Sequence, residues 1–439
     1  MLDVLRNRTY RHLFLAQVIA LVGTGLATVA LGLLAFDLAG EQAGAVLGTA
    51  LAIKMIAYVA VAPIAGAFAE VLPRRAMLVT LDLVRAAVAL CLPFVSEIWQ
   101  VYVLIFVLQS ASAAFTPAFQ ATIPDVLPEE KDYTRALSLS RLAYDLESLV
   151  SPMLAAALLT VISFHSLFAG TVFGFLASAA LVVSVTLPNH PAKERRSIYE
   201  RTTRGLKIYL ATPRLRGLLA LCLTVSAAGA MVIVNTVVFV QAKFELTASD
   251  TAIALAAFGS GSMLAALVLP RLLDRMPDRL VMLYGAALLS AGLIATAFIE
   301  TYGLLLALWF LLGIGYSVVQ TPSGRLLRRS AHPEDRPALF AAHFALSHAC
   351  WLITYPLAGW LGVVVGLPGT ALIMAAMGAA GLVTAVSLWE MADEAEVEHS
   401  HDDLADDDPH LREGHHRQGR RHSHAFMIDR LHPDWPREH

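Results

Sequence analysis

The sequence predicts an all-α membrane protein in which twelve transmembrane helices form two six-helix bundles, followed by a disordered polar tail. Hydrophobic residues make up 57% of the 439 residues and charged residues only 15%, whereas soluble domains carry about 25% charged residues. Apolar stretches long enough to cross a bilayer recur along the chain. A short charged motif also occurs twice, 204 residues apart, which indicates that the two halves share one plan.

The apolar stretches fall into two sets of six. In the first half, spans are expected at about 12–36, 44–69, 76–96, 99–121, 136–162 and 167–187. In the second half, they are expected at about 217–241, 251–270, 280–299, 303–321, 338–363 and 369–389. The first stretch is too long for the apolar core of a signal peptide, so we expect it to remain as a span. The predicted units are an N-terminal bundle (1–187), a central connection (188–216), a C-terminal bundle (217–390) and the tail (391–439).

Basic residues set the expected orientation. With the N-terminus inside, the inner connections and both tails hold 28 of the 32 Lys and Arg, and the outer connections hold only Lys243. This bias follows the positive-inside rule and predicts that both termini are cytoplasmic. The central connection carries eight basic residues and is expected against the anionic inner membrane surface. We therefore expect a monomer in the inner membrane of a bacterium, with the lipid bilayer as its surroundings.

The repeated motif is the first candidate for a moving part. Residues 70–75 and 274–279 both read acid-x-x-Pro-x-Arg, after the second and the eighth span. Duplicated halves are typical of secondary transporters, which rock between two open states. Such a loop can form ion pairs that hold the inner face closed in one state and break in the other. The alternative is that Arg74 and Arg75 only anchor the orientation.

The two six-span halves, the basic central connection and this motif together resemble the major facilitator superfamily. The family pattern after span two is Gly-x-x-x-Asp-Arg-x-Gly-Arg-Arg. Gly66, Arg74 and Arg75 match it, Glu70 replaces the Asp, and the remaining positions depart from it. A second pair, Asp82 and Arg85, lies three residues apart on span three and can support the gate. The predicted gating residues are Gly66, Glu70, Arg74, Arg75, Asp82, Arg85, Asp274, Arg275 and Arg279.

Two further stretches resemble exporters of this superfamily. In span five, Ser148, Ser151 and Pro152 stand in a pattern of small residues and proline that exporters place there. Small residues allow close helix approach, and a proline can bend the helix. The stretch 116–127 is similar to the branch that includes macrolide and siderophore efflux proteins. This resemblance implies transport out of the cell.

Ionisable side chains inside the spans are functional candidates, because a charge at membrane depth is costly. Arg141 and Asp145 are four residues apart and can pair. Asp145 and Glu147 are two residues apart, so they face different ways on the helix. One of them can pair with Arg141, and either is a plausible partner for Lys54. A carboxylate in a cavity could carry the coupling proton or bind a cation; the alternative is a static ion-pair network. The predicted coupling residues are Lys54, Arg141, Asp145 and Glu147.

Uncharged polar residues in the spans are candidates for cargo contact. His343 and His348 lie five residues apart in span eleven, so their rings diverge. Two such histidines are more often separate hydrogen-bonded residues than a chelate. Gln17, Asn235 and Gln320 are further cavity candidates.

The tail concentrates histidine. Nine of the fifteen histidines lie between His399 and His439. The tail is polar and acidic, so we expect it to be disordered. Neutral imidazoles bind nickel, cobalt, zinc and copper; the alternative is a solvated tail of biased composition. The candidate metal ligands are His399, His401, His410, His415, His416, His422, His424 and His432.

An exporter core with a histidine-rich tail resembles the nickel-resistance permeases of this superfamily. The resemblance implies proton-coupled efflux of a divalent transition metal, nickel or cobalt, by alternating access, with no cofactor other than the metal cargo. A second hypothesis is efflux of an amphipathic organic molecule such as a drug or siderophore. A third is a metal sensor or buffer that transports nothing. We find no nucleotide-binding loop or hydrolase motif and predict neither an enzyme nor a nucleic-acid partner.

Overall fold

The computed structural model describes residues 2–39, 43–69, 72–188, 198–389, 397–400, 421–424, 426–428, 431, 432 and 435. Twelve long helices dominate these residues, and each overlaps one predicted span. Ten of the helices in the described part are long and apolar enough to cross a membrane. The predicted fold class is therefore confirmed.

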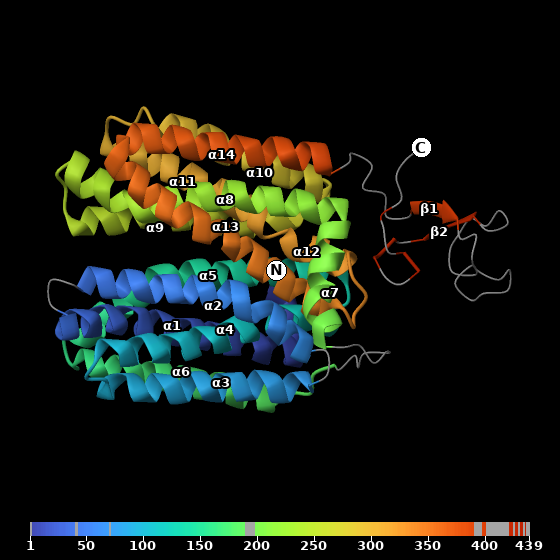
Figure 1. Ribbon diagram of the computed structural model, residues 1–439, viewed down its shortest axis with the longest axis horizontal. Helices are drawn as coiled ribbons and strands as arrows, with labels where there is room; N and C mark the ends of the chain where they lie inside the picture. Colours follow the sequence, from blue (N-terminus) through green and yellow to red (C-terminus); the bar gives the residue numbers. More distant parts are fainter. Residues whose placement is uncertain are drawn as a thin grey trace.

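The twelve long helices lie in two layers (Figure 1). The N-terminal bundle contains α1 (Arg8–Ala39), α2 (Ala43–Ala69), α3 (Arg74–Cys91), α4 (Ile98–Val126), α5 (Glu130–Leu159) and α6 (Phe164–Val183). The C-terminal bundle contains α8 (Pro213–Val237), α9 (Ala248–Leu273), α10 (Asp278–Thr296), α11 (Tyr302–Gln320), α13 (Arg336–Val364) and α14 (Gly366–Leu388), with the short α12 (Ser323–Arg329) between α11 and α13. Three shorter turns complete the helices: η1 (Leu2–Arg6), η3 (Leu92–Phe94) and the π-helical η4 (Val238–Lys243).

Local sequence explains where several helices begin. Thr247 and Asp250 form a capping box at the start of α9, in which each side chain bonds the backbone N–H of the other residue. Glu97 and Gln100 form the corresponding box at α4. These contacts satisfy amide groups that lack a partner within the first helical turn.

The two bundles have matching internal contacts. α1 packs on α6 as α8 packs on α14, and α3 packs on α4 as α10 packs on α11. The bundles meet mainly through α2 with α13 and α5 with α9. The 204-residue offset maps α2 onto α9 and α5 onto α13, so each of these helix pairs corresponds to the other. The duplication visible in the sequence therefore extends to the interface between the halves.

α7 (Ile198–Ala211) lies in the central connection and touches both layers. It packs against α13 and α2 (Figure 1). A Cβ at Gly205 would lie only 2.0 Å from the carbonyl oxygen of Ala338, so the two helix backbones are in close contact there. The central connection therefore supports the interface as well as joining the bundles.

Parts of the tail have structure that its composition did not predict. β1 (Val397–Ser400) and β2 (Arg421–His424) pair as antiparallel strands. Beyond them, Phe426 and Ile428 are buried with the C-terminal core, and Trp435 packs against it. The apolar run from Phe426 to Ile428 interrupts the polar sequence, and burial of such a run is favourable enough to fix it against a protein surface.

Close approach between α9 and α11 depends on glycine. A Cβ at Gly313 would lie 1.9 Å from the carbonyl oxygen of Phe258, and one at Gly261 would lie 2.0 Å from that of Phe310. Small residues at such crossings let helices pack backbone to backbone in a membrane.

We predict that Gly313→Ala destabilises the C-terminal bundle by about 1–3 kcal/mol, because the obstructing atoms belong to backbone that cannot rotate away. The melting temperature of the purified protein in detergent would fall. Gly303→Ala is the matched control on the same helix, because nothing lies within 4 Å of its added Cβ. Equal melting temperatures for the two variants would contradict the packing argument.

Candidate functional site

A cavity of about 450 Å³ lies between the two bundles. α1, α2, α4 and α5 line one side of it, and α8, α11, α12 and α13 line the other. Among the described residues, its charged lining consists of Lys54 and Arg141. Its aromatic lining comprises Tyr58, Phe119, Tyr133, Tyr144, Tyr316, Phe340, Phe344, Trp351 and Tyr355. The cavity is thus aromatic, with cationic and uncharged polar groups.

Arg141 connects the bundles at this cavity. It pairs with Asp145 one helical turn away on α5, as the spacing predicted. Its Nε also lies 3.1 Å from Ser262 Oγ on α9, and its guanidinium lies 4.8 Å from the ring centre of Tyr316 on α11. One side chain therefore contacts three helices from both halves.

Lys54 and Glu147 lie near one another without direct contact. No acidic oxygen in the described part of the chain lies within 4.0 Å of Lys54 Nζ, but its charge acts on Glu147 and on His348. Glu147 faces α1, where its Oε1 is 2.7 Å from the position of a Cβ on Gly25. Of the two carboxylates expected for Lys54, Asp145 pairs with Arg141 instead, and Glu147 forms no ion pair with Lys54 in the described structure.

The uncharged candidates divide into cavity and packing residues. Gln17, Gln320, His343 and His348 all line the cavity. Asn235 is not part of the lining of this cavity: it is buried, and its Nδ2 donates to the carbonyl of Ala358 at 3.2 Å. A polar residue in a span can equally satisfy a neighbouring helix, and sequence does not reveal which face it occupies.

The two histidines have different partners. His343 Nδ1 is hydrogen-bonded with the hydroxyl of Tyr209 on α7 at 3.1 Å. Burial raises the pKa of the Tyr209 phenol well above its usual range, so this hydroxyl stays protonated. His348 Nδ1 lies 2.7 Å from the carbonyl oxygen of Phe344 and donates to it. Each ring is therefore held by its own hydrogen bond, as expected for separate histidines.

One end of the molecule carries a network of ion pairs centred on two buried carboxylates, and we call it the charged end. It is formed by the starts of α3, α5, α10 and α13, the end of α4, and α12. Asp125 at the end of α4 pairs with Arg74 at the start of α3 and with Arg336 at the start of α13. The Arg74 and Asp125 side chains are 6% and 2% exposed. Asp125 therefore links its own bundle to the other.

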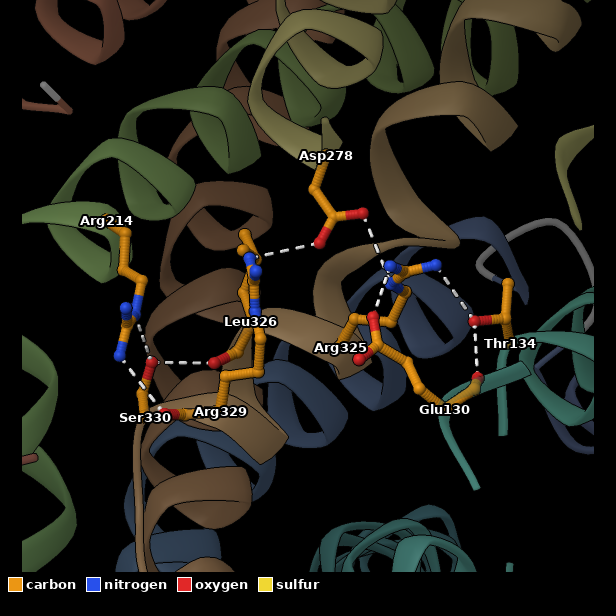
Figure 2. Close-up of polar contacts among 8 residues, drawn as sticks. All are labelled: Glu130, Thr134, Arg214, Asp278, Arg325, Leu326, Arg329 and Ser330. Atoms are coloured by element: carbon orange, nitrogen blue, oxygen red, sulfur yellow. Dashed lines mark hydrogen bonds and ion pairs between the residues drawn. The ribbon is translucent and has the colours of Figure 1, made fainter. Parts of the chain in front are cut away.

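A second acid, Asp278, organises the C-terminal side of the charged end (Figure 2). Its carboxylate lies 3.2 Å from Arg325 Nε and 3.1 Å from Arg329 Nη2. Arg325 also pairs with Glu130 and donates to Thr134 Oγ1 at 3.0 Å, both on α5 of the opposite bundle. Arg328 donates to the carbonyl oxygen of Pro128. α12 thus closes the charged end against α5.

The two halves repeat this arrangement with the charges reversed. Arg74 pairs with Asp125, 51 residues away, and Asp278 pairs with Arg329, also 51 residues away. The 204-residue offset carries the first pair onto the second, with acid and base exchanged. The next residue keeps its charge in both halves. Arg75 donates to the carbonyl of Val183, and the equivalent Arg279 donates to the carbonyls of Val386 and Trp389.

The predicted gating residues are only partly in this network. Arg74 belongs to it, and a Cβ at Gly66 would lie 2.8 Å from Ala341 Cβ at the α2–α13 contact. Asp274 and Arg275 are exposed, and the acid that forms the ion pairs in this half is Asp278. Glu70 lies outside the described residues.

Asp82 and Arg85 form the predicted pair, but inside the N-terminal bundle. Ser178 on α6 donates to Asp82 at 2.8 Å. The Arg85 guanidinium lies 4.0 Å from the ring centre of Phe115 and 4.5 Å from that of Phe175. This pair therefore joins α3 to α4 and α6 within one bundle.

The tail docks on the charged end. Arg204 on α7 donates to Asp335 Oδ2 and to the carbonyl of Ile428, both at 3.0 Å. The Arg214 guanidinium lies 5.3 Å from the ring centre of Trp435, and Arg214 also donates to Ser330 Oγ at 2.8 Å, just after α12. Docked tail residues are thereby connected to the helices that close the charged end.

Of the tail histidines predicted as metal ligands, His432 is the one whose side chain the structure describes. No three His, Cys, Asp or Glu side chains in the described part of the chain gather as a metal site requires. His432 is buried and packs edge-on against Phe426. The strand register places His399 opposite His422, with His424 opposite Val397. His401, His410, His415 and His416 lie outside the described residues.

Two similar six-helix bundles around a central cavity, with a network of ion pairs at one end, are typical of a membrane transporter fold. A family model described as Major Facilitator Superfamily matches residues 13–238 and 219–416. The chain belongs to this superfamily, and it is a multi-pass membrane protein of a transporter family rather than an enzyme.

Relatives and solved structures agree with this assignment. The chain is 25% identical over 367 residues to the uncharacterized MFS-type transporter YvqJ of Bacillus subtilis, covering 79% of this chain and 84% of that protein. It is 26% identical over 152 residues to macrolide efflux protein A of Enterococcus faecalis, covering 32% and 47%. In fold, it is similar to an outward-facing bacterial homologue of the iron transporter ferroportin, with TM-score 0.73, 13% identity, and 87% and 99% coverage.

We predict that Asp125→Asn opens the charged end, because it removes the acid shared by Arg74 and Arg336 and leaves two buried cations without it. Spin labels at Lys131 on α5 and Arg271 on α9, in a chain whose native cysteines are replaced, report the opening in nanodiscs. The share of a longer distance should rise about tenfold or more, where tenfold corresponds to ~1.4 kcal/mol.

Asp132→Asn is the matched control for this change. Asp132 lies at the same end, but pairs with Arg135 on its own helix. If Asp125→Asn and Asp132→Asn gave the same distance distribution, the shared acid would not hold the bundles together.

We predict that Trp435→Ala weakens the same closure to a smaller extent. Loss of the stacking on Arg214 loosens a contact worth ~0.5–1 kcal/mol, so the longer distance should gain about two- to fivefold. Trp99→Ala, at an exposed tryptophan of α4, is the control. An unchanged distribution for Trp435→Ala would show that tail docking does not act on the gate.

Proposed function

We propose that this protein is a secondary transporter that exports an amphipathic organic molecule from a bacterial cytoplasm in exchange for protons. The observation that carries this proposal is the lining of the central cavity. It is built from aromatic rings with a few polar groups, which is typical of sites for organic ligands. The partial identity to macrolide efflux protein A supports export as the direction.

The distribution of basic residues supports the orientation in this proposal. The charged end carries the arginines of α3, α12 and α13, and the positive-inside rule places such an end in the cytoplasm. The protein then lies in the plasma membrane with both termini in the cytoplasm. The ion pairs at the charged end close the cavity toward the cytoplasm in the present state, and the alternative state requires them to separate.

Metal export is the second candidate. A divalent ion prefers oxygen, imidazole or thiolate ligands without adjacent cations, whereas the described cavity lining holds Lys54 and Arg141 and no carboxylate. The tail supports a role for metal: the β1–β2 register sets His399 opposite His422, and opposed strand positions lie close together. In this second candidate, the tail and not the cavity would bind nickel or cobalt first.

One experiment separates the two candidates. Inverted membrane vesicles that carry the protein would be given an inward-acid proton gradient, and accumulation of labelled organic probes (1-naphthoate and a macrolide), nickel or cobalt would be followed. We expect gradient-dependent accumulation of an organic probe that Ser347→Trp abolishes, because Ser347 lines the cavity. Ser387→Trp, at an exposed position of α14, should leave it intact.

The contrary outcome is equally specific. Gradient-dependent nickel or cobalt accumulation that is lost when the chain is ended at Trp389, with no organic cargo moved, would establish metal export. Metal bound by the full chain without any flux would indicate a sensor or buffer.

A further inference from the structure

We propose that the cavity selects a cargo that carries an anionic group beside an aromatic ring, and that Lys54 is the residue that recognises the anion. This inference rests on the proposed export of an organic molecule and names its class. It is carried by the layout of four charges around the cavity and by the rings that surround Lys54.

The four charged side chains of this region are sorted by sign. Lys54 and Arg141 line the cavity, whereas Asp145 and Glu147 do not belong to the described lining. Asp145 is 3% exposed and bonded to Arg141, and Glu147 faces α1. The cations therefore line the cavity, whereas the two acids lie outside its described lining. At short range in a medium of low polarity, the nearer charges dominate the field that a cargo meets.

Arg141 has little capacity left for a cargo. Its guanidinium is used by Asp145, by Ser262 on α9 and by the face of Tyr316. These contacts join the two bundles, so a ligand that replaced them would also weaken the interface. Arg141 is better suited to hold the cavity together.

Unlike Arg141, Lys54 is not held, in the described part of the chain, by an acid or by contacts that join the bundles. Among the described residues it has no acidic partner within 4.0 Å, and Glu147 acts on it only from a distance. An ammonium group presents three donors and no acceptor, so it can bind a carboxylate, sulfonate or phosphate directly. Its Nζ lies 5.5 Å from the ring centre of Tyr58, one helical turn further along α2.

The surroundings of Lys54 specify the rest of the cargo. Tyr58, Phe344 and His348 form a cluster of three rings, with centres 4.9 Å, 4.8 Å and 4.1 Å apart. The cluster combines α2 with α13, the helices that meet at the bundle interface. A flat aromatic part can pack against these rings while its anionic group reaches Lys54. The expected cargo is thus an aromatic carboxylate or a related acid.

The test uses three probes with one ring system. 1-Naphthoate, 1-naphthamide and 1-naphthylmethylammonium differ chiefly in charge, and their binding to the full-length protein in nanodiscs can be followed by quenching of the cavity residue Trp351. We expect naphthoate to bind about tenfold more tightly than naphthamide and the ammonium probe to bind most weakly. Lys54→Met should reduce the naphthoate-to-naphthamide ratio to about one, whereas Lys54→Arg should retain it.

Lys243→Met is the matched control, because Lys243 lies in η4 and donates to the carbonyl of Ile299, away from the cavity. A preference for the ammonium probe, or an unchanged ratio in Lys54→Met, would overturn the assignment. In that case naphthamide binding together with macrolide export would leave the proposed function standing. Binding of none of the three probes, together with no organic flux in vesicles, would overturn both.

Discussion

The closure of the charged end by shared carboxylates is the interaction on which the rest of this structure depends. Asp125 and Asp278 each form ion pairs with two arginines, and through Arg336 and Arg325 they connect the bundles. A buried acid with two basic partners is stable only while both partners remain, because separation exposes each charge to an environment that solvates it poorly. Such an arrangement favours two discrete states, closed with all pairs made or open with the groups hydrated.

The reversal of charge between the halves explains how a duplicated protein can use this device. An exact repeat would place like charges opposite one another where the bundle ends meet. Here, the position of Asp125 in the first half is occupied by Arg329 in the second, and that of Arg74 by Asp278. Asp125 and Glu130 of the N-terminal bundle therefore pair with arginines at the start of α13 and on α12. Each half keeps its internal pair, and the two halves attract.

The sequence predicted the parts of this structure that depend on periodicity and composition. Apolar length identified all twelve long helices, and the four-residue spacing identified the Arg141–Asp145 pair. It did not identify Asp278, because the motif matches Asp274 to Glu70 by residue type, whereas the acid that forms the ion pairs stands at the position equivalent to Arg74. It also did not show which way Asn235 faces, because the direction of that side chain is set by the crossing of α8 and α13. The docking of Phe426 and Trp435 depends on a surface that only the folded bundle provides.

The cavity and the gate are close enough for one to act on the other. Ile123 lines the cavity two residues before Asp125, Tyr133 lines it three residues after Glu130, and Gly324 lines it directly before Arg325. A Cβ at Gly324 would lie 2.7 Å from the hydroxyl of Tyr133, so α12 and α5 touch at the cavity itself. A cargo can shift the balance between two states only by binding them unequally. In the proposed open form, Tyr133 and Gly324 would separate with the bundles, so their contacts would differ from those of the closed form. A cargo that contacts these two residues would therefore change the stability of the ion pairs within one helical turn of them.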